Sequence, residues 1–422
     1  MDIMDMIGDI KKRKIVLYGD CEEILVFIQK YGSKVYIKQV ITDFPDEVKW
    51  QTYGEWGIKT YLFDDVAFED ELIIICTHKR YNTFERRLLH SNRVEYRDFI
   101  SQELVDGLLY GKKILVCMGT SRMKQIADTL PMIREVETQY SVVFFAENEM
   151  LKIYKNRIQE YKHVCKLCDV YIRSSCEKSL YGLKICCEKD LKPGCRIITV
   201  SDYEFTAYYP QISNNRDTYS NYFFREHERL DMDYDTLAFS RQDYIIENLC
   251  KENDSEEYIA NEILREDFFQ EEEILSYFND KLTSFLEKEK DDDIKIGSFI
   301  KENYRKCLCR NIDEWSSPVI IYVIDKILKK IGFDYIILNE KIIQDKIEEQ
   351  SGSEMLIYPS VSKYLELDLE DSKMYKIKTY YTTRYMNAYG YTRYHIKYLK
   401  KAMELTDYAR MYNYWSEDTT QN

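Results

Sequence analysis

The residues best placed for chemistry form a short turn of mostly small side chains, Gly119-Thr120-Ser121-Arg122. The turn follows the apolar run KILVCM and precedes a helical pattern that ends at Leu130. Such a turn exposes the serine hydroxyl at a helix N-terminus, where backbone amides and the helix dipole stabilise an oxyanion. Ser121 is therefore a candidate nucleophile, with Gly119, Thr120 and Arg122 as oxyanion or substrate-binding groups. An ordinary helix cap accounts for the turn equally well.

A serine nucleophile needs a proton acceptor, and the sequence holds five histidines. His227 follows an aromatic segment that contains Tyr209 and Gln211, and His395 lies in a basic, tyrosine-rich stretch near the C-terminus. Both are candidate catalytic bases. Since none of the five stands in a recognisable catalytic motif, a structural role is the commoner outcome for each.

The twelve cysteines are too sparse for a disulfide scaffold. The pattern Cys165-x-x-Cys168, followed by Cys186-Cys187 and Cys195, could suggest zinc, but a second C-x-x-C or a histidine pair is missing. We predict reduced thiols in apolar helices and strands, and no metal.

A second turn could hold a nucleotide. Gly19 follows the apolar run KIVLY and opens a helix-compatible stretch, and Asp43 ends the next apolar run, where a ribose hydroxyl would be held. Only one glycine of the usual G-x-G-x-x-G pattern is present. A tight turn that binds no nucleotide is the more favoured interpretation.

These turns need parallel strands to position them. Short, β-branched runs separated by helix-sized gaps predict one strand–helix series near the N-terminus and a second that begins near residue 111. We expect an α/β protein with two Rossmann-like parallel sheets: residues 1–110, and residues 111–422 with helical insertions and a helical C-terminus. The predicted strands are 14–18, 34–42, 59–63, 71–76, 113–118, 141–145, 169–172 and 196–200, and the predicted helices include 148–167 and 316–331.

Charge is distributed unevenly along the chain. Residues 252–293 hold 16 acidic and 4 basic residues, while residues 372–403 hold eight basic residues, eight tyrosines and no acid. Apolar residues at helical spacing predict a pair of amphipathic helices in the acidic block (Ile274, Leu275, Phe278, Leu282 and Phe285). The basic segment suits either docking on the acidic block, which we favour, or the phosphates of a cofactor held by Arg393, Lys397 and Lys400.

Composition excludes several classes of protein. The formal net charge of −14 argues against a general nucleic-acid or anionic-membrane binder. The first 14 residues carry charges throughout and lack the apolar core of a signal peptide, and apolar runs fall far short of a membrane span. We expect a cytoplasmic protein with no membrane span.

Several of these segments together resemble the WcbI-type polysaccharide biosynthesis family, described as acetyltransferases of capsule assembly. The matches run in the family's order over about residues 112–365. They are the turn Gly119–Arg122 for the family's G-N-C-Q, the strand DVYIRS ending at Ser174, the segment FTAYYPQ ending at Gln211, the pair Ser317-Pro318 before an apolar helix, and IYPSV at Ile357–Val361. The N-terminal residues are similar, at the level of fold, to sugar-nucleotide-binding domains that precede sugar-modifying enzymes.

The sequence departs from the family at three positions. The family's cysteine is replaced by Ser121, a glutamine by Ser174, and the histidine before proline by Ser317. Serine can replace cysteine in acyl transfer, but loss of the histidine removes the expected proton acceptor, and such help is typically worth about 10²–10⁴-fold.

The resemblance implies an acetyl or other acyl transferase that uses coenzyme A and acts on a sugar or sugar-nucleotide of a surface polysaccharide. Ser174, Tyr209, Gln211 and Ser317 would then line the substrate site. Two alternatives stay open: a non-catalytic member that binds glycan-assembly proteins, and an esterase-like hydrolase using the same turn. The sequence does not decide the acceptor sugar, the acyl group or the oligomeric state.

Overall fold

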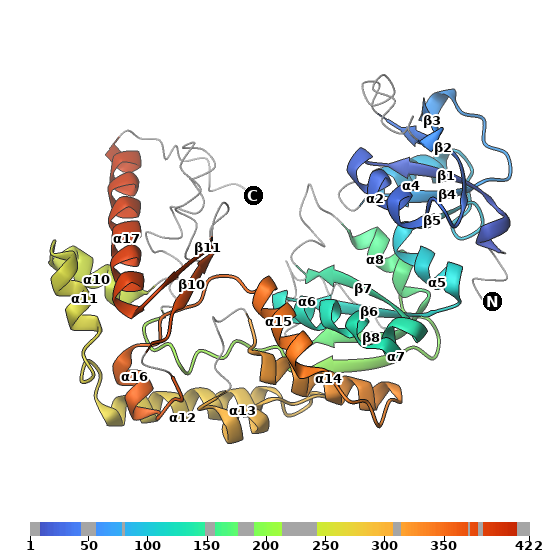
Figure 1. Cartoon of the computed structure of the whole chain (residues 1–422). Coiled ribbons are helices and arrows are strands. Elements are labelled where there is room, and N and C mark those ends of the chain that lie inside the picture. Colours follow the sequence, from blue (N-terminus) through green and yellow to red (C-terminus); the bar gives the residue numbers. More distant parts are fainter. Residues whose placement is uncertain are drawn as a thin grey trace. The chain divides into compact units, whose positions relative to one another are not determined.

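The computed structural model describes residues 9–43, 56–77, 81–147, 157–175, 190–212, 243–306, 314–369, 372–378 and 383–411. The chain forms two compact units, each treated separately below (Figure 1). The first comprises Met1–Asp202, Asp292–Ile294 and Tyr322–Asn339, and the second comprises Tyr203–Asp291, Lys295–Ile321 and Glu340–Asn422. The predicted boundary at residue 111 falls inside the first unit, between its two sheets, and stays a prediction.

The first sheet has five parallel strands in the order β3-β2-β1-β4-β5. This is the strand order of a doubly wound, Rossmann-like sheet through its fifth strand, which confirms the predicted class. The strands are β1 (Lys14–Gly19), β2 (Tyr36–Thr42), β3 (Lys59–Leu62), β4 (Leu72–Cys76) and β5 (Phe99–Ser101). The helices between them are α2 (Cys21–Tyr31) and α4 (Tyr81–His90).

Both faces of this sheet are covered, as its nearly continuous apolar strands require. Val16 and Tyr18 of β1 pack with Phe84 and Leu88 of α4 on one face. On the other face, alternate strand residues such as Leu17 pack toward α2 and join a core that continues into the second sheet. The two sheets of the first unit therefore share one hydrophobic core.

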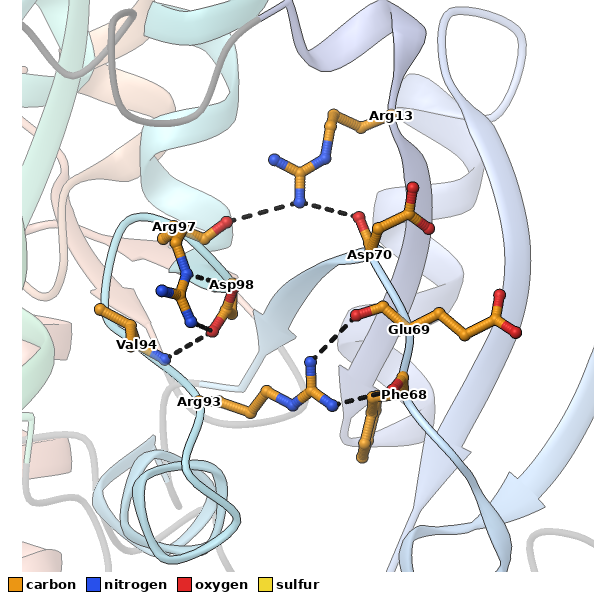
Figure 2. Close-up of polar contacts among 8 residues, drawn as sticks. All are labelled: Arg13, Phe68, Glu69, Asp70, Arg93, Val94, Arg97 and Asp98. Atoms are coloured by element: carbon orange, nitrogen blue, oxygen red, sulfur yellow. Dashed lines mark hydrogen bonds and ion pairs between the residues drawn. The ribbon is translucent and has the colours of Figure 1, made fainter.

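Arginines fix the amino-terminal edge of the first sheet through backbone carbonyls (Figure 2). Arg13 Nη2 donates to Asp70 O at 3.0 Å and to Arg97 O at 3.4 Å, and Arg93 Nη1 donates to Glu69 O at 3.2 Å. These contacts hold the segments that lead into β4 and β5. The charges at this edge are thus engaged in folding, and ligands of such sheets usually bind at the opposite, carboxyl edge.

The second sheet has four parallel strands in the order β7-β6-β8-β9. The strands are β6 (Lys113–Gly119), β7 (Tyr140–Ala146), β8 (Cys168–Ser174) and β9 (Arg196–Val200), and the helices are α5 (Val105–Tyr110), α6 (Ser121–Thr129), α7 (Arg134–Gln139) and α8 (Ile158–Cys165). All four predicted strands are confirmed. The helix predicted over residues 148–167 is described only from residue 157 onward.

The second unit is mainly helical. Its elements are α10 (Tyr244–Glu252), α11 (Glu256–Ile263), α12 (Glu271–Lys288), α13 (Gly297–Asn303), α15 (Glu340–Gln350), α16 (Pro359–Tyr364), α17 (Ala388–Met411) and the antiparallel hairpin β10 (Tyr375–Lys378) with β11 (Thr383–Met386). The apolar helix α14 (Ser317–Ile331) belongs to this unit as far as Ile321 and to the first unit from Tyr322 onward, and it agrees with the predicted helix 316–331. Within the described residues, no helix is long and apolar enough to span a membrane.

The acidic block folds as predicted, with helices α11 and α12. Ile274, Phe278, Leu282 and Phe285 of α12 are buried, whereas Leu275 is 37% exposed because it lies beside the buried stripe rather than on it. The basic helix α17 packs on α10 and α11. This confirms the favoured interpretation that the basic segment docks on the acidic block.

Candidate functional site

The candidate site lies at the carboxyl edge of the second sheet, where the direction of strand order reverses. From β6 the chain first adds β7 on one side, through α6, and then adds β8 on the other. The loops that leave β6 and β8 diverge at this point, and ligands of open α/β sheets bind in the resulting crevice. The turn Gly119–Arg122 follows β6, and Ser174 ends β8, so the structure places both at this switch point.

Gly119 is required by the backbone. Its φ is +154°, and a Cβ added there would lie 2.5 Å from Met123 Cγ and 2.8 Å from Ser174 Cβ. A side chain would therefore strain the turn and collide with the end of β8. The close approach brings Gly119 and Ser174 together, and their role in one site stays a prediction.

Gly119→Ala should lower the free energy of unfolding by about 2–4 kcal/mol, because strain and overpacking add. Gly111→Ala is the matched control: Gly111 also has a positive φ of +64°, but nothing lies within 4 Å of its added Cβ. That variant should lose only about 1–2 kcal/mol. Urea unfolding curves compare the two. Equal losses would show that the collision with Ser174 is relieved at no cost.

The hydroxyl of Ser121 is presented by the first turn of α6. Thr120 is the N-cap residue, and its hydroxyl oxygen accepts the backbone N–H of Arg122 at 3.3 Å. Ser121 is the first helical residue and is exposed. The helix start therefore places an exposed serine among first-turn amides that lack intrahelical partners, where negative charge is stabilised.

A buried ion pair that the sequence analysis missed fixes this turn. Asp202, two residues beyond β9, is 0% exposed and its carboxylate pairs with Arg122 Nε, while Arg122 is 4% exposed. Thr120 Oγ1 donates to Asp202 Oδ2 at 2.8 Å, and Arg122 Nη2 donates to the Asp202 carbonyl oxygen at 2.8 Å. One carboxylate thus holds the residues on both sides of Ser121. The sequence did contain a signal for this ion pair, because Asp202 is an acidic residue just past the predicted strand 196–200.

The residues predicted downstream lie in the second unit. Tyr209 and Gln211 are both 0% exposed, and Gln211 Nε2 donates to Leu356 O at 2.8 Å. Ser317 is the first residue of α14 and is 6% exposed. Their proposed role in binding substrate stays a prediction.

A buried carboxyl group lies beside the Gln211 segment. Asp243 caps α10 by accepting the N–H groups of Ile245 and Ile246, and Tyr358 donates its hydroxyl to Asp243 Oδ2 at 2.7 Å. Complete burial raises the pKa of Asp243 to about 7, although the backbone N–H groups and Tyr358 act in the opposite direction. The folded state therefore binds a proton at this carboxyl more tightly than the unfolded state does.

Asp243→Asn should flatten the pH dependence of stability. An acid whose folded pKa exceeds its unfolded value of about 3.9 contributes stability below that value and loses it as the pH rises through 7. Burial raises the pKa of Glu85 to about 7 as well, so the wild-type profile contains both groups. Urea midpoints between pH 4 and pH 8 should fall less for the variant than for the wild type. Parallel profiles would contradict a titrating Asp243.

The two candidate bases are placed differently. His227 lies outside the described residues. His395 is 2% exposed in α17, in edge-to-face contact with the Tyr391 ring at 6.1 Å, and burial lowers its pKa to about 3. The His395 ring is thus neutral at physiological pH. Ser121 belongs to the first unit and His395 to the second, and their catalytic roles stay predictions.

The three cations assigned to a cofactor contact the acidic block. Arg393 Nη2 lies 3.3 Å and Lys397 Nζ lies 4.0 Å from Glu256 Oε2, and Lys400 Nζ donates to Asp254 O at 2.6 Å. Since the first two pairs are partly exposed, each contributes little stability. Cofactor binding by these side chains is untested.

The weak nucleotide site of the first sheet has structural partners. A Cβ at Gly19 would lie 2.0 Å from Cys76 O, so glycine is needed where β1 approaches β4. Asp43 Oδ1 accepts the Tyr18 hydroxyl at 2.8 Å and pairs with Arg87 Nη1 at 2.5 Å. Nucleotide binding there stays a prediction.

Within the described residues, two groups of side chains have the composition of a metal site, and the ligand atoms of each lie within 4.8 Å of one another. One is Glu69, Asp70 and Glu71, and the other, which includes a histidine, is Glu85, Glu95 and His163. The backbone N–H of Ser101 donates to His163 Nε2 at 3.3 Å, so the ring proton lies on Nδ1, which is 2.6 Å from Glu95 Oε1. Lys166 Nζ is 3.0 Å from Glu95 Oε2. The hydrogen bonds and the lysine charge satisfy His163 and Glu95 without an ion.

Comparison with known proteins supports the resemblance. The family model described as polysaccharide biosynthesis enzyme WcbI matches residues 159–335. That range includes Ser174, Tyr209, Gln211, His227 and Ser317, but not the turn around Ser121. The predicted resemblance is confirmed for the matched stretch.

A solved structure of WcbI, described as a novel polysaccharide biosynthesis enzyme, is similar in fold. It is 14% identical, with a TM-score of 0.51, over 72% of this chain and 96% of that chain. That structure is described as the native protein without a disulfide bond between coenzyme A and one of its cysteines. No curated protein matches the sequence.

Proposed function

We propose that this chain, whose residues 159–335 match the WcbI polysaccharide biosynthesis family, transfers an acyl group, acetyl in the first instance, from coenzyme A to a sugar or sugar-nucleotide. The observation that carries the proposal is the exposed residue Ser121 in the first turn of α6, at the switch point of the sheet. The description of the similar WcbI structure names coenzyme A, which supports this donor.

In the transfer, an acceptor hydroxyl takes the acyl group as the thioester C–S bond breaks and the coenzyme A thiol leaves. Ser121 is the nucleophile or the group that positions the acceptor. Backbone amides at Gly119 and Thr120 and in the first turn of α6 stabilise the developing oxyanion. Because the Arg122 guanidinium already donates to Asp202, we assign it to holding the turn.

The donor's phosphates need cations. Arg393, Lys397 and Lys400 are the proposed group, and they would have to leave Glu256 and the Asp254 carbonyl to bind a phosphate. Partly exposed ion pairs exchange partners at low cost, which makes such a switch feasible.

A second candidate function is a non-catalytic member of a glycan-assembly system. The replacement of the family's histidine by Ser317, which is 6% exposed, favours it. Such a member would keep the fold and lack the proton acceptor.

Titration calorimetry with coenzyme A and acetyl-coenzyme A tests the proposal without knowledge of the acceptor. Micromolar binding supports an acyltransferase, and no binding at millimolar ligand contradicts it. Once an acceptor is identified, Ser121→Ala should abolish transfer. Ser276→Ala removes another exposed helical serine, on α12, and should leave transfer unchanged. Binding without transfer on a broad acceptor panel would favour the non-catalytic reading.

A further inference from the structure

Two cysteines lie side by side on neighbouring strands of the second sheet. Cys168 begins β8, Cys195 directly precedes β9, and Tyr171 of β8 pairs with Ile197 of β9. In the pairing of β6 with β8, Ile114 faces Cys168 and the next residue, Leu115, faces Val170. Asp169 is therefore an extra residue in β8, which forms a bulge. This bulge turns Cys168 to the face that Tyr171 occupies, which is also the face of Cys195, two residues before Ile197.

The spacing suits a disulfide. Continued by one residue, the register of β8 and β9 puts Cys195 opposite Asp169, next to Cys168. With strands about 4.8 Å apart and a rise of about 3.3 Å per residue, the Cα atoms of Cys168 and Cys195 are about 6 Å apart, within the roughly 4.4–6.8 Å that a disulfide spans. Both cysteines contact one hydrophobic cluster. Each thiol donates to a backbone carbonyl, Cys168 Sγ to Val170 O at 2.9 Å and Cys195 Sγ to Arg196 O at 3.9 Å, and both cysteines are free. The bond could therefore form without movement of the strands.

The two thiols differ in accessibility and acidity. Cys168 is 0% exposed, and burial raises its pKa well above the usual value. Cys195 is half-buried, and the neighbouring Cys168 thiol, together with the Lys192 charge, lowers the pKa of Cys195. Cys195 is thus the more accessible thiol and the better nucleophile.

We propose that Cys195 and Cys168 form a site of reversible thiol–disulfide exchange with low-molecular-weight disulfides of the glutathione type. The Cys195 thiolate attacks one sulfur of the small disulfide, forming a mixed disulfide and releasing one thiolate. The Cys168 thiol then gives up its proton and attacks Cys195 Sγ, forming the protein disulfide and releasing the second small thiol. The two electrons lost by the cysteines reduce the small disulfide. The site is independent of the proposed transferase function.

The test treats the reduced full chain with glutathione disulfide and follows intact mass and peptide maps. The wild type should lose two hydrogens and yield a peptide pair linked through Cys168 and Cys195. Cys168→Ser should instead accumulate one glutathione on Cys195, since the second step is blocked. Cys195→Ser should leave Cys168 unmodified, because the buried thiol is inaccessible.

Controls separate this pair from the other ten cysteines. Cys165→Ser removes a buried thiol at the end of α8, three residues before Cys168, and should leave the linked pair unchanged. A stable glutathione adduct on Cys195 in the wild type, or a disulfide from Cys195 to a different cysteine, would overturn the proposal. The wild-type peptide map decides this point even where a variant fails to fold.

Discussion

Asp202→Ala is expected to lower the free energy of unfolding by about 3–5 kcal/mol, because it leaves the Arg122 guanidinium buried without its counter-charge. Both side chains lie almost entirely out of solvent, at 5% and 0% exposure, so water cannot replace the lost partner. Thr120 loses its hydrogen-bond acceptor in the same change. Urea unfolding monitored by far-UV circular dichroism measures the loss.

A surface pair on the same helix provides the control. Lys124 Nζ lies 2.6 Å from Asp128 Oδ2, and the two side chains are 56% and 26% exposed. Asp128→Ala should therefore cost less than about 1 kcal/mol. Adding Arg122→Met to Asp202→Ala should recover part of the stability, since it removes the unpaired charge. A double variant less stable than Asp202→Ala would show that the guanidinium stabilises the turn without the carboxylate.

The long strands were predictable because each is a buried, β-branched run bounded by turn residues. The edge strand β5 was not predicted, since Phe99–Ser101 has three residues and shows no periodicity in sequence. Its place is set by tertiary pairing with β4 and by arginine contacts such as Arg13 to the Arg97 carbonyl. Local pattern therefore specifies the central strands, and long-range contacts specify the edge.

The docking of the C-terminal segment was predictable from charge alone. The acidic block carries nearly all of the chain's net negative charge, and the segment rich in lysine and arginine has no acid to pair with locally. The contacts of Arg393 and Lys397 with Glu256 follow that complementarity. The distribution of charge along the sequence does not show which lysines and arginines can still bind a ligand, because that depends on the geometry of each ion pair in the folded chain.

The sequence predicted the turn of the candidate site but not the ion pair that holds the turn. The turn was visible because a glycine, a capping threonine and a serine follow an apolar strand. Asp202 was missed because it lies 80 residues from its partner Arg122. Arg122 follows β6 and Asp202 follows β9, and these two strands are not neighbours in the sheet. Sequence shows which residues end each strand, but the order of strands decides which ends meet. Once β8 and β9 are known to follow β6, the position just past β9 becomes an evident place to look.

Ser121→Cys is expected to capture coenzyme A as a mixed disulfide. The resemblance places Ser121 where the family has cysteine, and the solved WcbI structure is described by reference to a disulfide between coenzyme A and a cysteine of that protein. The reagent is coenzyme A disulfide: the new thiolate attacks one of its sulfurs, and the other coenzyme A leaves as a thiolate, so no further oxidant is needed. If the switch point binds coenzyme A, the reagent is held beside the new thiol and reacts at high effective concentration. Intact mass should show one added coenzyme A, assigned by peptide mapping to position 121.

The capture must be distinguished from the general reactivity of a helix N-terminus, which lowers the pKa of any cysteine there. Ser276→Cys places a thiol on another exposed helical position, and glutathione disulfide supplies a reagent without the nucleotide. If coenzyme A binds specifically, Ser121→Cys should react faster with coenzyme A disulfide than with glutathione disulfide. Ser276→Cys should react with the two disulfides at similar rates. Acetyl-coenzyme A should protect position 121 and leave position 276 reactive. Equal rates with both reagents, unaffected by acetyl-coenzyme A, would mean that the switch point holds a reactive turn without a coenzyme A site, and the function proposed for Ser121 would lose its support.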